Sequence, residues 1–130
     1  MNNRDYEKKE KRKILFAILF ILLVGIVYFY PAQRILAEIK YKEYAKQQGV
    51  TGEDIANISY QKDYKQDGYY VDVEYKSDPK HRYEYHYFLI DSWRTELKLH
   101  RMYCDVYDKE NYLLSKGECE IRGVVYMPLE

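Results

Sequence analysis

The residues best suited to covalent chemistry are two cysteines, Cys104 and Cys119. They lie at equal separations from the midpoint of a turn between Asn111 and Tyr112, so a hairpin of that register would place them opposite each other. In an oxidising compartment this arrangement predicts a disulfide, which would contribute about 3 kcal/mol by restricting the unfolded chain. Two separate free thiols are the alternative. A redox role is not indicated, because the C-x-x-C spacing of disulfide oxidoreductases is absent.

The three histidines do not form a metal-binding pattern. His81 and His86 are five residues apart, which places them on opposite faces of a regular strand, and His100 is isolated in the sequence. The sequence contains no H-x-x-x-H, G-x-S-x-G or glycine-rich phosphate-binding motif. It therefore predicts no catalytic residues, no metal and no cofactor, and we expect that the protein is not an enzyme.

Tyrosine is unusually abundant, with 17 occurrences in 130 residues. Several tyrosines recur at every second position, which would align their rings on one face of a strand. Two interpretations are open. The rings could build the core of a small sheet, where tyrosine has a high propensity, or they could form a shallow aromatic platform for a glycan or a peptide. The candidate binding face consists of Tyr69, Tyr75, Tyr83, Tyr85 and Tyr87.

The elements that would position these residues form an α+β pattern. Residues 33–48 contain good helix formers and are followed by Gly49, a typical helix stop. The alternating, strand-like segments are 57–65, 69–76, 81–90, 92–108 and 118–127. Asp67-Gly68 is a hairpin signal between the first two of them. We expect a helix packed on an antiparallel sheet of about five strands, preceded by a transmembrane helix.

The predicted transmembrane helix is the apolar run at residues 14–30, which contains no charged or amide side chain. Seventeen helical residues span about 25 Å, just enough for a hydrocarbon core of roughly 30 Å. A cleavable signal peptide is the alternative, but the run is not followed by a good A-x-A-like cleavage site. We therefore expect an uncleaved signal anchor that contacts membrane lipid through residues 14–30.

The charges are balanced overall, with 21 basic and 21 acidic residues, so the basic excess of a nucleic-acid-binding protein is absent. The balance hides a segregation. Residues 1–13 hold six Lys or Arg against three Asp or Glu, whereas residues 31–130 hold 15 against 18. The positive-inside rule then predicts a cytoplasmic basic segment at 1–13, and an extracytoplasmic α+β domain at 31–130, in a single-pass protein of the cell membrane.

Several segments together resemble a domain-of-unknown-function family of short, single-anchor membrane proteins of Gram-positive bacteria. They are the basic N-terminus, the anchor ending Val-Tyr-Phe-Tyr-Pro31, the helix end Gln47–Val50, and the stretch Asp67–Tyr75 followed by Asp78-Pro79. The resemblance covers about residues 1–90. It implies the bacterial cell membrane and an extracytoplasmic α+β domain, and it carries no assigned activity and no site residues.

The expected function follows from location and from the missing catalytic patterns. The sequence favours a non-enzymatic module that binds a protein or an extended peptide at the cell surface, through a sheet edge or the tyrosine face. The alternative is binding of a cell-wall polymer, a glycan, through the tyrosine-rich sheet face. The ligand and the oligomeric state are not determined by the sequence.

Overall fold

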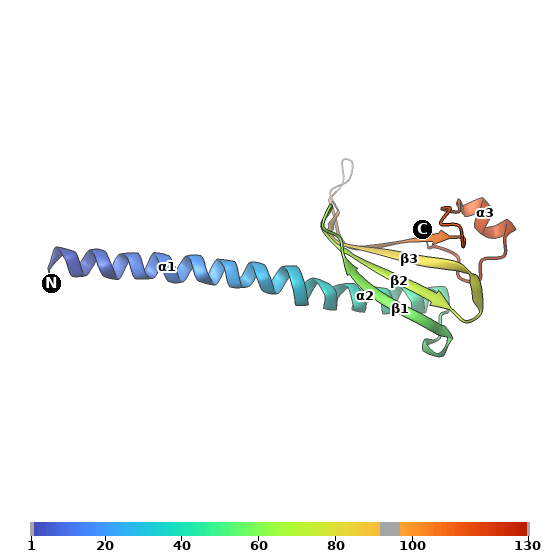
Figure 1. Cartoon of the computed structure of the whole chain (residues 1–130), viewed down its shortest axis with the longest axis horizontal. Helices are drawn as coiled ribbons and strands as arrows, with labels where there is room; N and C mark the ends of the chain where they lie inside the picture. Colours follow the sequence, from blue (N-terminus) through green and yellow to red (C-terminus); the bar gives the residue numbers. More distant parts are fainter. Residues whose placement is uncertain (1, 92–96, 130) are drawn as a thin grey trace. The chain divides into compact units, whose positions relative to one another are not determined.

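The computed structural model describes residues 2–91 and 97–129, and the chain divides into two units, Met1–Ala32 and Gln33–Glu130. The first unit contains helix α1 (Asn3–Val27) and a π-helical segment, η1 (Tyr28–Ala32) (Figure 1). Pro31 lies inside η1. Because proline has no backbone N–H to donate, regular α-helical bonding is interrupted at this residue, and the chain forms a π-helical turn there.

The first unit carries the predicted membrane-spanning segment. α1 has no buried residue, and its apolar side chains from Ile14 to Val27 are about half to three-quarters exposed. In the part of the chain that the structure describes, one helical stretch, Asn3–Gln48, is long and apolar enough to cross a membrane. This finding rests on length and composition, and it agrees with the lipid contact expected for residues 14–30.

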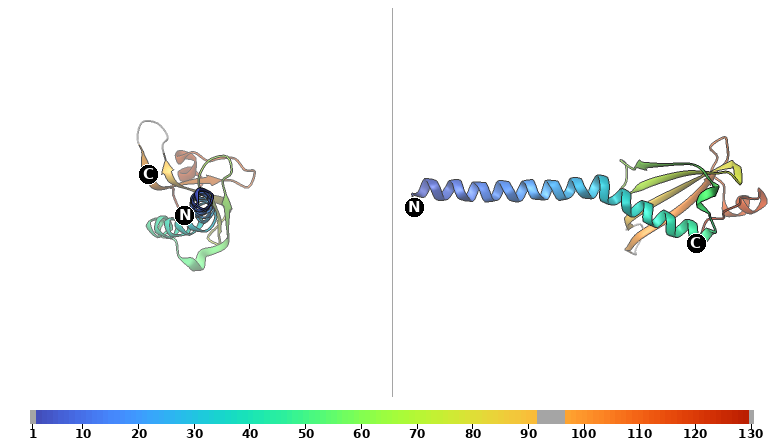
Figure 2. Two further views of the ribbon diagram at one scale, coloured as in Figure 1. Left: turned by 90° about the vertical axis from the view of Figure 1, so that its left-hand side faces the viewer. Right: turned by 90° about the horizontal axis from the view of Figure 1, so that it is seen from below.

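The second unit is an α+β domain, as predicted. Helix α2 (Gln33–Gln48) has the predicted bounds and lies across one face of a four-stranded antiparallel sheet (Figure 2). The strands pair in sequence order, β1-β2-β3-β4. They are β1 (Ile55–Lys62), β2 (Tyr69–Tyr75), β3 (Asp78–Asp91) and β4 (Lys98–Tyr107). A short 3₁₀ helix, η2 (Gly52–Asp54), precedes β1, and α3 (Lys116–Ile121) follows β4.

The strand register explains the core. Val71 of β2 lies opposite Tyr85 of β3, and Tyr85 lies opposite Cys104 of β4, so these side chains share the face that α2 covers. α2 contributes Ala37, Tyr41, Tyr44 and Ala45 to the buried set. Alternation along the strands then places the remaining inward side chains in the same layer.

The predicted fifth strand at 118–127 is wrong, because this segment begins as helix α3. Ser115 accepts a hydrogen bond from the Glu118 backbone N–H, and the Glu118 side chain accepts one from the Ser115 backbone N–H. This capping box starts a helix where alternation alone suggested a strand. The predicted strand 92–108 corresponds to β4 from Lys98 onward, and residues 92–96 lie outside the described residues.

Candidate functional site

The five tyrosines of the candidate binding face line the interior of the domain. Tyr83, Tyr85 and Tyr87 are 0% exposed, and the other two, Tyr69 and Tyr75, are 6% and 1% exposed. All five lie on the sheet face that α2 covers. Of the two interpretations of these tyrosines, their burial supports the sheet core, and it leaves no exposed ring on this face for the glycan platform.

Hydrogen bonds explain how so many hydroxyl groups can be buried together. The hydroxyl of Tyr75 lies 2.9 Å from that of Tyr41 and 2.8 Å from that of Tyr85, which donates to Gln48 Oε1 at 2.8 Å. Burial raises the pKa of the Tyr75 hydroxyl to about 12. The rings meet edge to face, and the centroids of Tyr85 and Tyr44 are 5.6 Å apart. The tyrosines thus form a core whose polar atoms satisfy one another.

The disulfide predicted between Cys104 and Cys119 is absent, and both residues are free and buried. Cys104 points into the core from β4, whereas Cys119 belongs to α3. The returning chain pairs with β4 through the single bridge between Tyr107 and Leu113, and it then leaves the sheet to form α3. The symmetric hairpin that would have placed the sulfurs opposite each other does not form.

We expect neither thiol to react with iodoacetamide in the folded protein. Burial raises the pKa of the Cys104 thiol and that of the Cys119 thiol, so little thiolate is present near neutral pH. After unfolding in guanidinium without reductant, the intact mass should show two alkylations. Modification of the native protein, or fewer than two alkylations after unfolding, would contradict the free, buried thiols.

The three histidines lie in separate surroundings. His81 Nδ1 is 2.6 Å from Asp78 Oδ1, inside the domain, and His100 Nδ1 is 2.7 Å from the Tyr87 hydroxyl. Within the described residues, three or more His, Cys, Asp or Glu side chains are nowhere grouped closely enough to hold a metal ion. Of the three histidines, His86 lies on the face of the sheet opposite α2.

That opposite face, which we call the open face, carries a row of aromatic rings. The ring of His86 stacks on Tyr70 at 4.0 Å between centroids and is 4.0 Å from the ring of Phe88. Phe88 in turn meets Tyr103 edge to face at 6.0 Å. The row continues into apolar side chains at Ile90 and Leu99, which pair across β3 and β4 and are 52% and 61% exposed.

Charged side chains lie beside this aromatic row. Three carboxylates, those of Asp72, Glu84 and Asp105, occupy directly opposed positions on β2, β3 and β4. Arg82 donates to Asp72 at 2.9 Å and to Glu84 at 3.0 Å. Burial and the neighbouring Glu84 charge raise the pKa of Asp72 and that of Asp105. The open face therefore combines an apolar, aromatic strip with an acidic strip.

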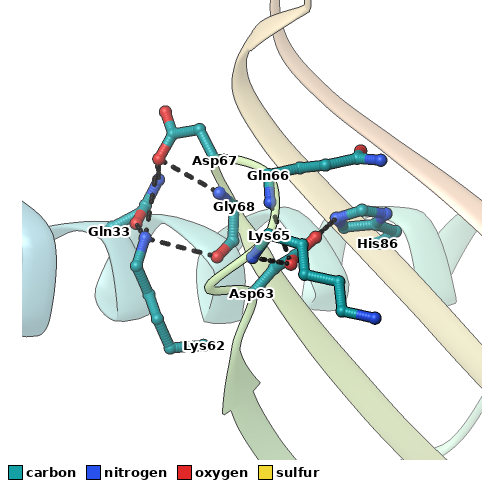
Figure 3. A network of polar contacts seen from close by, with 8 residues as sticks. All are labelled: Gln33, Lys62, Asp63, Lys65, Gln66, Asp67, Gly68 and His86. Atoms are coloured by element: carbon teal, nitrogen blue, oxygen red, sulfur yellow. Dashed lines mark hydrogen bonds and ion pairs between the residues drawn. The ribbon is translucent and has the colours of Figure 1, made fainter.

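The loop between β1 and β2 supports the aromatic row from one end (Figure 3). Asp63 Oδ1 accepts hydrogen bonds from the backbone N–H groups of Lys65 and Gln66, and Asp63 Oδ2 lies 3.3 Å from His86 Nε2. Although burial opposes ionisation of Asp63, the two backbone donors hold its pKa below the usual value. Burial lowers the pKa of His86 more than the Asp63 carboxylate raises it.

Stability should therefore fall as the solution is acidified from about pH 7 to about pH 5. Because the pKa of His86 is lower in the folded protein, the unfolded chain binds a proton first, and protonation favours unfolding. Asp63 contributes to stability in its ionised form. That contribution is lost only at lower pH, as the pH falls through the lowered pKa of Asp63. Urea titrations of the full chain in detergent at several pH values measure both effects.

His86→Gln should flatten this dependence, while His100→Gln serves as a matched control on the other face of the sheet. An unchanged pH profile in His86→Gln would contradict the assignment to His86. The same titration in the control should keep the loss of stability on acidification.

Most residues of the open face were not recognised in the sequence. Because Tyr70, Phe88 and Tyr103 alternate with the buried positions, the sequence does place them on the second face of their strands. The alternation does not say which face a helix covers when both faces hold aromatic residues. The burial of the odd-numbered tyrosines of β3 settles that choice.

Comparison with known proteins identifies a family but no function. A family model described as "Protein of unknown function (DUF3139)" matches residues 9–85, which is more than half of the chain and reaches into β3. No curated protein matches the sequence, and no solved structure matches the fold.

Proposed function

The chain belongs to this family of unknown function, and we propose that it is a single-pass membrane protein that binds a protein partner through the open face. The anchor would be residues 14–30, with residues 1–13 in the cytoplasm and the domain at 31–130 outside the cell membrane. The excess of basic residues before the apolar run supports this orientation. The resemblance to single-anchor proteins of Gram-positive bacteria supports a cell-surface location.

The observation that carries the proposal is the exposed apolar strip on the side of the sheet away from α2. Ile90, Leu99 and Tyr103 are each about half exposed, and they adjoin the partly buried rings of Phe88 and His86. An exposed apolar patch with a polar border is typical of a protein-binding surface. The adjacent acidic strip favours a partner segment that carries Lys or Arg next to its apolar residues.

A non-enzymatic role fits the composition of this face. Two of its acidic residues, Asp72 and Glu84, are paired with Arg82, and its exposed centre is apolar. We therefore propose recognition without chemistry, at a surface held by a rigid sheet.

Photo-crosslinking in intact cells tests the proposal. A photoreactive phenylalanine analogue replaces Tyr103 on the open face, and in a matched control it replaces Lys42, whose side chain is 72% exposed on α2. We expect a reproducible crosslinked partner from position 103, reduced more than about tenfold by Phe88→Ala together with Ile90→Ser. Equal crosslinking from both positions, or none from position 103, would refute binding through the open face.

A further inference from the structure

Gln33 meets two side chains that are distant from it in the sequence, Lys62 and Asp67, where α2, β1 and the β1–β2 loop come together (Figure 3). Gln33 is the first residue of α2 and is 0% exposed, and Lys62 is the last residue of β1, with 5% of its side chain exposed. Lys62 Nζ contacts Gln33 Oε1 directly. Asp67 Oδ1 accepts a hydrogen bond from Gln33 Nε2 at 2.6 Å and lies 3.5 Å from Lys62 Nζ.

This arrangement contains a nucleophile, an electrophile and a proton carrier for an acyl transfer. A neutral lysine amine is a nucleophile, and the carbonyl carbon of a glutamine amide is an electrophile. The carboxylate is the proton carrier, because it is in contact with both the attacking nitrogen and the nitrogen that would leave. The fold also holds the reacting groups together, which replaces an encounter between distant parts of the chain by a local step.

We propose that the Lys62 amine displaces ammonia from the Gln33 side chain and forms an isopeptide cross-link between β1 and α2. Asp67 accepts a proton from the Lys62 ammonium, and the neutral Nζ attacks Gln33 Cδ. Asp67 then passes that proton to Nε2 as the Cδ–Nε2 bond breaks. That proton completes the departing ammonia, and the second Nζ proton leaves with it, so the products are a secondary amide and NH₄⁺, and Asp67 is regenerated as a carboxylate.

The surroundings favour the product over the separate side chains. The ring of Tyr69 lies 5.4 Å from Lys62 Nζ, and Gln33 Oε1 and the carbonyl oxygen of Gly68 also lie against the amine. A buried ammonium is costly, whereas an amide is neutral and keeps an N–H that can still bond to Asp67. The Asp67 side chain is 36% exposed, which gives ammonia a route to solvent.

The position of the bond would strengthen the domain where the anchor joins it. Gln33 directly follows the π-helical segment, so any pull along the chain from the membrane reaches the domain first through this residue. A covalent tie from Gln33 to the end of β1 would pass that force into the sheet without relying on hydrogen bonds. Reaction would require prior folding, because the two residues are 29 positions apart in the sequence.

Intact-mass analysis of the purified full chain in detergent tests the cross-link. Loss of one ammonia lowers the mass by about 17 Da relative to the sequence with the observed N-terminus. After proteolysis, tandem mass spectrometry should find the peptides containing Gln33 and Lys62 joined. Lys62→Arg and Asp67→Asn should both return to the full calculated mass. Lys65→Arg, in the same loop, is the matched control and should keep the mass deficit.

The outcomes are distinguishable when folding is checked by near-ultraviolet circular dichroism. A folded wild-type chain at the full calculated mass would overturn the proposal by itself, whatever the variants do. A mass deficit that persists in Lys62→Arg would place the ammonia loss elsewhere, for example at an asparagine, and would also overturn it. A deficit that persists in folded Asp67→Asn would overturn the role of Asp67 as proton carrier.

Discussion

Tyr85→Ala is expected to lower the free energy of unfolding by about 4 kcal/mol, because it empties the centre of the core. The Tyr85 ring is 0% exposed and packs edge to face against Tyr41 and Tyr44, with centroids 4.9 Å and 5.6 Å away. Its hydroxyl also joins Tyr75 to Gln48. Urea unfolding of the full chain in detergent, followed by near-ultraviolet circular dichroism, measures the change.

Two further variants separate the causes of this loss. Tyr85→Phe keeps the ring but leaves the Tyr75 hydroxyl and Gln48 Oε1 short of a partner, so we expect a loss of about 1–3 kcal/mol. Tyr64→Ala is the matched control, because the Tyr64 side chain is 81% exposed, and it should change stability by less than about 0.5 kcal/mol. Equal effects of Tyr85→Ala and Tyr64→Ala would contradict the buried position of Tyr85.

The parts of the fold that depend on local patterns were predictable. The helix at 33–48 follows from its helix formers and from Gly49, which adopts a φ of +84° at its end. β2 follows from strict alternation at residues 69–75. In both cases the deciding interactions lie within a few residues, so the sequence pattern contains them.

The remaining features depend on contacts between distant residues. Alternation places Tyr85 and His86 on opposite faces, but only the packing of α2 decides that Tyr85 is inside and His86 outside. Equal spacing of the cysteines about a turn suggested a hairpin, while the capping box at Ser115 redirected the chain into a helix. The contact between Gln33 and Lys62 depends on how α2 packs against β1, which no local sequence pattern predicts.

Gly68→Ala is the second change that we expect to be severe, with a loss of at least about 3 kcal/mol. Gly68 has a φ of +127°, in a region that side chains with a Cβ rarely adopt. An added Cβ would also lie 2.1 Å from the carbonyl oxygen of Tyr87. That oxygen belongs to the backbone of β3 and cannot move aside as a flexible side chain would. The pairing of Tyr69 with Tyr87 must therefore distort.

Substitutions at two other glycines, measured by the same urea titration, separate the backbone strain from the steric clash with Tyr87. Gly117→Ala, within α3, has open space and an ordinary backbone conformation, so it should be neutral or stabilising by up to about 1 kcal/mol. Gly49→Ala also has open space but keeps the positive φ, so it should cost about 1 kcal/mol from backbone strain alone. If Gly68→Ala cost no more than Gly49→Ala, the close approach of the β1–β2 loop to Tyr87 would be refuted. The loss of stability should therefore decrease in the order Gly68→Ala, Gly49→Ala, Gly117→Ala. The result also concerns the open face, because the approach of the β1–β2 loop to Tyr87 places Gly68 close to His86.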